Sequence, residues 1–254
     1  MSRPRDPRAW LRRLRAQPAQ PAEPAPPEPQ PAPDWLLRDG LDSTNMRRLV
    51  SFLLRPGDNA VDVGSNHGAL LAEMLRVAPQ GHHVAFEPIP ELAADLRARF
   101  PTAEVHEAAA SNVTGTATFS HVRAADGWSG LKFRPLPTGA DGDVVEIEVR
   151  LAPLDELLDP DVPRALIKID VEGAEQQVIE GALETLKAQR PTVIFEHGLG
   201  SANVFGTTPD DIHGLLVGEI GYRIFDLDGN GPYPLDEFKR VFWAAERVNF
   251  VAHV

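Results

Sequence analysis

The chain of 254 residues contains no cysteine, which excludes disulfide bonds, thiolate metal sites and cysteine nucleophiles. It also lacks any run of about 18 apolar residues, so we expect no integral contact with a membrane. Basic residues are comparatively few, since 25 Lys and Arg stand against 37 Asp and Glu, for a formal net charge of −12. A protein that follows the phosphates of a nucleic acid concentrates positive charge. The composition therefore argues against a nucleic-acid partner.

Proline is abundant, and ten of the 24 prolines lie within residues 1–33. This stretch has no apolar periodicity, so we expect a disordered tail rich in Pro and Arg. A secretory signal would need an apolar segment after the first arginines, but proline and glutamine follow them, so we expect a cytoplasmic protein. Residues 34–254 are long enough to bury one core and form the predicted functional domain.

Segments with the periodicity of strands and helices alternate along this domain. In chain order they are 42–54 (helix), 59–64 (strand), 69–77 (helix), 83–88 (strand), 91–100 (helix), 103–109 (strand), 165–170 (strand), 174–186 (helix) and 192–197 (strand). Between them, residues 115–122 and 144–151 resemble a hairpin around a loop rich in Gly and Pro. Repeated β-α-β units predict an α/β fold in which helices cover both faces of an open, mostly parallel sheet.

A glycine-rich turn follows the first predicted strand and leads into a helix. Its residues are Asp62, Val63, Gly64, Ser65, Asn66, His67 and Gly68. Ligands of open α/β sheets bind beyond the carboxyl ends of the strands, and the free N–H groups of the helix suit a polar or anionic group. The G-x-N-x-G spacing differs from the G-x-G-x-x-G of dinucleotide-binding proteins.

Glu87 ends the second predicted strand, 23 positions after Gly64. A carboxylate at this place can accept hydrogen bonds from both hydroxyls of an unphosphorylated ribose. Together with the glycine-rich turn it indicates a cofactor that contains adenosine. Asp62, ahead of the glycines, favours S-adenosylmethionine over NAD.

Several further segments complete a pattern that covers roughly residues 55–200. They read VDVGSNHG (61–68), FEP (86–88), EAAASNVTGTATF (107–119), VRLAPLDELL (149–158), IKIDVEGAEQQVIEGA (167–182) and PTVIFEH (191–197). In the order and spacing of these segments the chain resembles the FkbM-type S-adenosylmethionine-dependent methyltransferases. The part IKIDVEGAE is the most specific.

The resemblance implies a Rossmann-like class I methyltransferase: a sheet of seven strands with an antiparallel last strand, and S-adenosylmethionine as cofactor. It also implies methyl transfer to a hydroxyl of a sugar, a glycan or a polyketide-type secondary metabolite. Carried over by position, the cofactor-binding residues would be Asp62, Gly64, Ser65, Asn66 and Gly68 for the methionine part, Glu87 for the ribose and Ala109 beside the adenine. The pair Ser129-Gly130 departs from the two serines common in the family, in a loop expected to face the acceptor.

Polar side chains also follow the fourth and fifth strands of the implied sheet. They are Lys168, Asp170, Glu172, Glu196 and His197. The topology gathers them near the point of methyl transfer, where an alcohol acceptor needs a base or a metal ion to take or acidify its proton. We expect His197 to be the base, because its ordinary pKa lies near neutral pH, with Asp170 orienting it or binding the acceptor.

Other roles remain open for this group of residues. Glu172 or Glu175 as a cap of the following helix, and Lys168 as an ion-pair partner of Asp170, are the structural alternatives. A divalent cation on Asp170 and Glu196 is the alternative to a base, but we predict no metal, since these are few ligands for a hard cation. Transfer to nitrogen or to an RNA ribose, and a non-catalytic module that binds S-adenosylmethionine, are the alternative functions. The sequence leaves the oligomeric state open.

Residues 226–237 match the pattern of a calcium-binding loop. Asp226, Asp228, Asn230 and Glu237 occupy the ligand positions, with Gly231 at the turn. A calcium loop needs a helix on each side, whereas the preceding YRIFDL alternates like a strand and prolines fall inside the loop. We therefore expect an acidic turn between strands.

Overall fold

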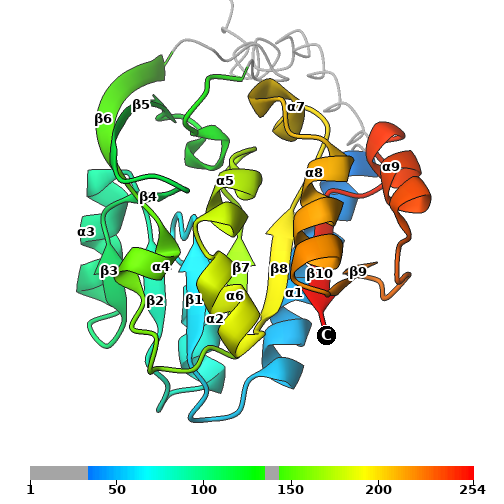
Figure 1. Ribbon diagram of the computed structural model, residues 1–254. Helices are drawn as coiled ribbons and strands as arrows, with labels where there is room; N and C mark the ends of the chain where they lie inside the picture. Colours follow the sequence, from blue (N-terminus) through cyan, green and yellow to red (C-terminus); the bar gives the residue numbers. More distant parts are fainter. Residues whose placement is uncertain (1–33, 135–142) are drawn as a thin grey trace, which may run out of the picture. The chain divides into compact units, whose positions relative to one another are not determined.

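The computed structural model describes residues 34–134 and 143–254 (Figure 1). The chain divides after Leu37, and the architecture below is that of the unit Arg38–Val254. The predicted tail, residues 1–33, and part of the loop rich in Gly and Pro, residues 135–142, lie outside the described residues.

A seven-stranded sheet forms the centre of this unit (Figure 1). Its strands, in spatial order, are β3 (Glu104–His106), β2 (Val84–Phe86), β1 (Ala60–Val63), β7 (Leu166–Ile169), β8 (Thr192–Glu196), β10 (Asn249–His253) and β9 (Arg223–Asp226). The first five are parallel, and β10 is antiparallel to both of its neighbours. The strand order reverses between β1 and β7, which is where open α/β sheets bind ligands. The predicted sheet with an antiparallel last strand is confirmed.

Helices pack on both faces of the sheet (Figure 1). One face is covered by α1 (Asp34–Leu53), α2 (Ala69–Val77) and α3 (Pro90–Arg99). The other is covered by α4 (Leu154–Leu157), α5 (Glu175–Glu180), α6 (Leu183–Gln189), α8 (Pro209–His213), the π-helix η4 (Gly214–Glu219) and α9 (Leu235–Trp243).

Strand side chains alternate between these two layers. Ile167 and Phe195 pack in the cluster under α5 and α9, whereas Leu166 and Ile194 pack in the cluster with α1 and α2. Because successive residues of a strand point to opposite faces, this alternation also decides on which face each polar residue of the strands lies.

Two predicted elements are divided in the structure. The strand predicted at 103–109 becomes β3 and β4 (Ala109–Ala110), because β4 leaves the large sheet and pairs with β6 (Val144–Ala152). The helix predicted at 174–186 becomes α5 and α6. Gly181 lies between them, where an added Cβ would stand 2.0 Å from the carbonyl oxygen of Ser111. The close contact with this loop needs a glycine and interrupts the helix.

The predicted hairpin is confirmed as β5 (Gly115–Val122) antiparallel to β6. With β4 it forms a second, three-stranded sheet in the order β4-β6-β5. After β5 the chain forms the short 3-10 helix η2 (Asp126–Trp128), and after β8 the short helix α7 (Ala202–Phe205). Within the described ranges, none of the helices combines the length and the apolar character that crossing a bilayer requires.

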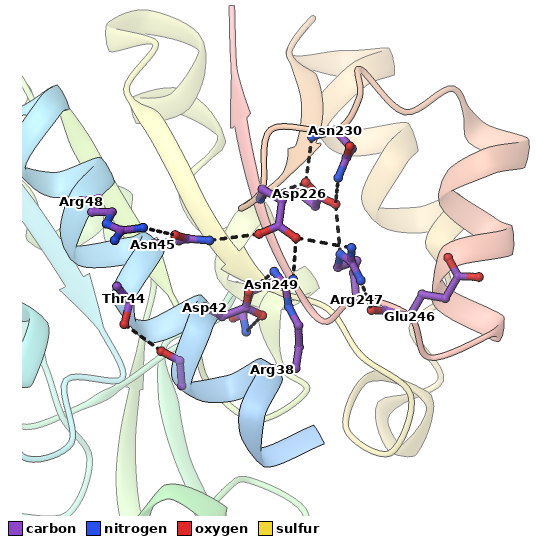
Figure 2. A network of polar contacts seen from close by, with 12 residues as sticks. Arg38, Asp42, Thr44, Asn45, Arg48, Asp226, Asn230, Glu246, Arg247 and Asn249 are labelled. Atoms are coloured by element: carbon purple, nitrogen blue, oxygen red, sulfur yellow. Dashed lines mark hydrogen bonds and ion pairs between the residues drawn. The ribbon is translucent and has the colours of Figure 1, made fainter. Parts of the chain in front are cut away.

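The loop that resembles a calcium site is an acidic turn, as expected, but it connects strand β9 to helix α9, so its expected position between two strands is wrong. Strand β9 precedes it, and the Asp226 carboxylate accepts hydrogen bonds from the N–H groups of Asp228 and Asn230 and from the Tyr233 hydroxyl. Arg247 donates a further hydrogen bond, so protein donors surround the carboxylate (Figure 2). These donors hold the pKa of Asp226 below its usual value, against the effect of its burial.

Candidate active site

Two adjoining hollows lie at the carboxyl ends of β1, β2 and β7, at the reversal of strand order. Both are lined by Gly64, Asn66 and Asp170, so they form one elongated cleft. The first lies beside Phe86 and Glu87, where β2 ends. The second extends from the glycine-rich turn toward α1 and includes Ser43 and Arg47.

The glycine-rich turn depends on left-handed backbone at three positions. Gly64 has φ of 72°, and an added Cβ there would stand 1.8 Å from the carbonyl oxygen of Asp170. Asn66 and Gly68 have φ of 48° and 72°. Ser65 is buried, and its hydroxyl donates to the carbonyl of Asp62 at 2.7 Å. The turn thus packs directly on the end of β7 and opens the N-terminus of α2 toward the cleft.

Glu87 lies at the end of β2, as predicted, and lines the first hollow. Its carboxylate accepts hydrogen bonds from the N–H of Asn66 at 2.7 Å and the N–H of Ile89 at 2.9 Å. Burial raises its pKa although these two donors favour the charged form. A carboxylate has about four acceptor positions, so two remain for the hydroxyls of a ribose.

Part of the first hollow is apolar. Ala109 lines it, as the resemblance implied, together with Phe86, Ile89, Phe119 and Leu131. Flat, apolar walls of this kind suit a purine ring. The chemistry of this hollow therefore fits adenosine.

Asp62 and Lys168 face each other across the paired strands β1 and β7. The Lys168 ammonium lies 3.3 Å from Asp62 Oδ1 and 3.6 Å from Asp170 Oδ2, and it donates to the carbonyl of Gly64 at 2.6 Å. Burial disfavours its charge, but the two carboxylates outweigh this and hold the pKa of Lys168 above its usual value. The expected pairing of Lys168 with Asp170 is thus present.

The Asp62 carboxylate is buried; its Oδ1 faces the Lys168 ammonium at 3.3 Å, whereas its Oδ2 has no partner among the described residues. A buried acceptor without a donor favours a cationic or hydrogen-bonding ligand group at that place. Asp62 lines the second hollow. It therefore fits the ammonium of a methionine, the role that the resemblance implied.

Three carboxylates gather where β7 and β8 end. Oxygens of Asp170, Glu172 and Glu196 lie within 4.8 Å of one another. Burial, reinforced by the neighbouring acids, raises the pKa of Glu172 to about 8 and that of Glu196 well above its ordinary value. Arg134 forms an ion pair with Glu172 and opposes this shift. A group of this kind holds protons near neutral pH and can exchange them with an acceptor.

The turn that carries Glu172 is held by a different acid. Glu175 is buried at the start of α5, and its Oε1 accepts hydrogen bonds from the N–H of Val171 and the N–H of Gly173. Glu172, with φ of 61°, points instead toward the cleft, which it lines. Of the two acids considered for a local structural role, Glu172 and Glu175, it is therefore Glu175 that holds this turn.

The structure does not bring His197 to the acids, so its expected placement is wrong. The ring is fully buried and stacks on Phe242 and Phe238, with centroid distances of 4.6 and 5.7 Å. Glu196 shares the face of Ile194, whereas His197, one residue later, shares that of Phe195. Burial lowers the pKa of His197 to about 4. A neutral imidazole inside an aromatic cluster is poorly placed to act as the base.

Other residues near the cleft were missed in the sequence. Arg134 comes after the hairpin's first strand, pairs with Glu172 and lies 5.0 Å from the centre of the Trp128 ring. Ser129, by contrast, belongs to the loop that the sequence predicts to face the acceptor; it lines the first hollow, and its hydroxyl accepts a hydrogen bond from the N–H of Val122. Ser43 and Arg47 stem from α1, which precedes every motif of the pattern. No local signal in the sequence relates these residues to the cleft.

Comparison with known proteins gives a consistent assignment. A family model described as the methyltransferase FkbM domain matches residues 62–224. The 2-O-methyltransferase NoeI of Sinorhizobium fredii is 30% identical over 159 residues, which are 57% of this chain and 65% of that protein. The family match confirms the resemblance found in the sequence and, with it, S-adenosylmethionine as the cofactor.

Two solved structures are similar at lower identity. Methyltransferase FkbM from Methylobacillus flagellatus has a TM-score of 0.49 and 15% identity, over 88% of this chain and 56% of that chain. The plantazolicin methyltransferase BpumL, in complex with S-adenosylhomocysteine, has a TM-score of 0.45 and 10% identity, over 86% of this chain and 84% of that chain.

Proposed function

The chain belongs to the FkbM methyltransferase domain family, and from this premise we propose that it transfers a methyl group from S-adenosylmethionine to a hydroxyl oxygen. The acceptor is a sugar, a glycan or a polyketide-type metabolite. The observation that carries the proposal is the group of three carboxylates, Asp170, Glu172 and Glu196, at the end of the cleft. A hydroxyl must lose its proton when it is methylated, and nearby carboxylates can receive it.

Asp170 is the proposed base, because it lines both hollows. The residues of the first hollow would hold the adenosine part of the cofactor and those of the second its methionine part, and the cofactor, when bound, would supply an electrophilic methyl group. Positioning of the hydroxyl provides most of the rate enhancement in such an in-line displacement. Asp170 accepts the hydroxyl proton, while Glu196 and Glu172 share the charge and protons of the group.

Two cations keep these acids in place. Lys168, on β7, contacts Asp170 and Asp62. Arg134, which follows β5, pairs with Glu172. We assign a positioning role to Lys168 and to Arg134, since each already forms an ion pair with protein carboxylates.

Two observations support a neutral, hydroxyl-bearing small molecule or glycan as the acceptor. The net charge of −12 disfavours a polyanion such as RNA. The name of the relative NoeI describes transfer to oxygen. The same carboxylates disfavour the alternative of a non-catalytic binding module, which has no use for a proton acceptor.

Release of S-adenosylhomocysteine from S-adenosylmethionine, in the presence of a panel of sugars, glycans and macrolides, tests the proposal. Asp170→Asn should lower kcat about 10²–10⁴-fold and leave cofactor affinity within a few fold. Asp95→Asn, a change at an exposed acid that pairs only with Arg99 within the described residues, serves as the control and should have no effect. Full activity of Asp170→Asn would remove it as the base, and cofactor binding without turnover on any hydroxyl would favour the non-catalytic module.

A further inference from the structure

The second hollow of the cleft is lined by side chains of both charges, which suits the ammonium and the carboxylate of an amino acid. Asp62, whose carboxylate is buried, lines this hollow. Arg47 of α1, an exposed residue, lines it too. An α-amino acid carries an ammonium and a carboxylate on one carbon, so a site for it needs one group of each sign.

The other strong cation of this hollow is already engaged. The Lys168 ammonium contacts the carboxylates of Asp62 and Asp170 and donates to the carbonyl of Gly64. Arg47 forms no ion pair with any residue of the ranges 34–134 and 143–254, although Glu73 is close enough to feel its charge. A guanidinium without a partner is a good donor to a carboxylate, which it can bind through two parallel hydrogen bonds.

The start of α2 supports the same position for a carboxylate. Ala69 and Leu70, in the first turn of this nine-residue helix, line the hollow together with Arg47. The first N–H groups of a helix have no partner within the helix, and they attract negative charge. No acidic side chain occupies this first turn.

A network of polar contacts fixes α1 beside the cleft (Figure 2). Asp228 accepts from Arg38 at 2.5 Å and from Asn45 at 3.0 Å, and Asn249 of β10 donates to the buried Asp42 at 3.1 Å. Ser43 and Arg47 are four residues apart on this helix, so they share one side of it, the side that lines the hollow. The acidic turn after β9 thereby holds the helix that carries Arg47.

We infer that Arg47, with Ser43 and the N-terminus of α2, binds the carboxylate of the methionine part of S-adenosylmethionine, opposite the ammonium site at Asp62. The inference rests on the proposed cofactor and adds a recognition element that lies before the family's matched residues 62–224. The charge of Arg47 thus distinguishes the full cofactor from adenosine compounds that lack the amino acid.

Two ligands separate this role from a general effect on the cleft. S-adenosylhomocysteine contains the amino acid, and 5′-methylthioadenosine lacks it. In calorimetry, Arg47→Ala should weaken binding of S-adenosylhomocysteine about 5- to 20-fold, while the affinity for 5′-methylthioadenosine changes less than about 2-fold. Arg47→Lys should recover part of the loss, because it restores the charge without the planar pair of donors.

Arg48→Ala is the matched control. Arg48 is exposed, adjacent on α1 and equally charged, and it contacts Asn45. It should leave both affinities unchanged. If Arg47→Ala weakens the binding of both ligands equally, or leaves the affinity for S-adenosylhomocysteine unchanged, the inference is overturned but the proposed function is not. Failure of the wild-type protein to bind S-adenosylhomocysteine would overturn the proposed function as well.

Discussion

Lys168 and Asp62 form a buried ion pair across two neighbouring parallel strands, with 3.3 Å between Nζ and Oδ1. The same ammonium donates to the carbonyl of Gly64, so the pair supports the glycine-rich turn directly. The Lys168 side chain thus connects the pairing of β1 and β7, through Asp62, with the turn that lines the cleft.

Removal of one partner of this pair should destabilise the fold strongly. Lys168→Met leaves two carboxylates near each other without their cation, and we expect a loss of about 3–5 kcal/mol in the free energy of unfolding. Asp62→Asn combined with Lys168→Met should recover part of it, because the buried charge is then removed as well. Urea denaturation without ligand measures both variants. Additive losses in the double variant would show that the two side chains do not interact.

Glu87 should contribute to every ligand that contains adenosine. Glu87→Ala removes an acceptor for the ribose and leaves the N–H groups of Asn66 and Ile89 without their partner, and we expect a loss of about 1.5–3 kcal/mol in binding free energy. The loss should be equal for S-adenosylhomocysteine and 5′-methylthioadenosine, in contrast to Arg47→Ala. Glu91→Ala, at an exposed acid in the first turn of α3, is the control. An unchanged affinity in Glu87→Ala would place the ribose elsewhere.

The fold could be predicted from sequence because its signals are local. Buried strands such as Ala60–Val63 are short apolar runs, and α2 begins and ends where its apolar stripe does. The glycine-rich turn and Glu87 could be placed for the same reason, since each directly follows a strand of a parallel sheet.

Other features depended on contacts between distant segments. Gly181 lies at the break between α5 and α6, where the Ser111 loop leaves no room for a Cβ, and this contact joins segments distant in sequence. His197 was placed with Glu196 because the two are adjacent in sequence, although the alternation of strand side chains already implies opposite faces. Arg47 and Arg134 reach the cleft from α1 and from the end of the hairpin segment, and nothing near them in sequence indicates this.

His197 should matter for stability in acid and little for catalysis. His197→Phe keeps the aromatic stack with Phe238 and Phe242, so kcat should remain within about 3-fold of the wild type. The pKa of His197 is lowered to about 4, below its unfolded value near 6.5, so its contribution is present above pH 6.5 and is lost as the pH falls toward 4. The wild-type protein should therefore lose stability over this range more steeply than the variant. Urea titrations at several pH values measure this, and a loss of kcat beyond about 10²-fold would restore His197 as a base.

The last prediction separates a carboxylate base from a metal ion at Asp170, Glu172 and Glu196. Burial raises the pKa of Glu172 to about 8, and that of Glu196 also rises. An acid with a raised pKa keeps its proton until the pH exceeds that value, so the group becomes a better proton acceptor as the pH rises. We expect kcat to increase up to about pH 8 and then to level off. Glu172→Gln removes one negative neighbour, so the remaining carboxyls should ionise more easily and the rise should move to lower pH.

A bound divalent cation would reverse these expectations, since its charge would keep all three carboxylates ionised and would itself acidify the acceptor hydroxyl. Dialysis against a chelator should leave turnover unchanged if the carboxylates act as the base. Three carboxylates can begin a coordination sphere, but hard cations take six or more oxygens, and Arg134 already competes for Glu172. The dependence of kcat on pH then completes the test, because the protein dialysed against chelator should give the same profile as the untreated protein. Loss of activity in chelator that Mg²⁺ restores, together with a flat profile between pH 6 and 8, would show that a metal ion and not Asp170 activates the hydroxyl.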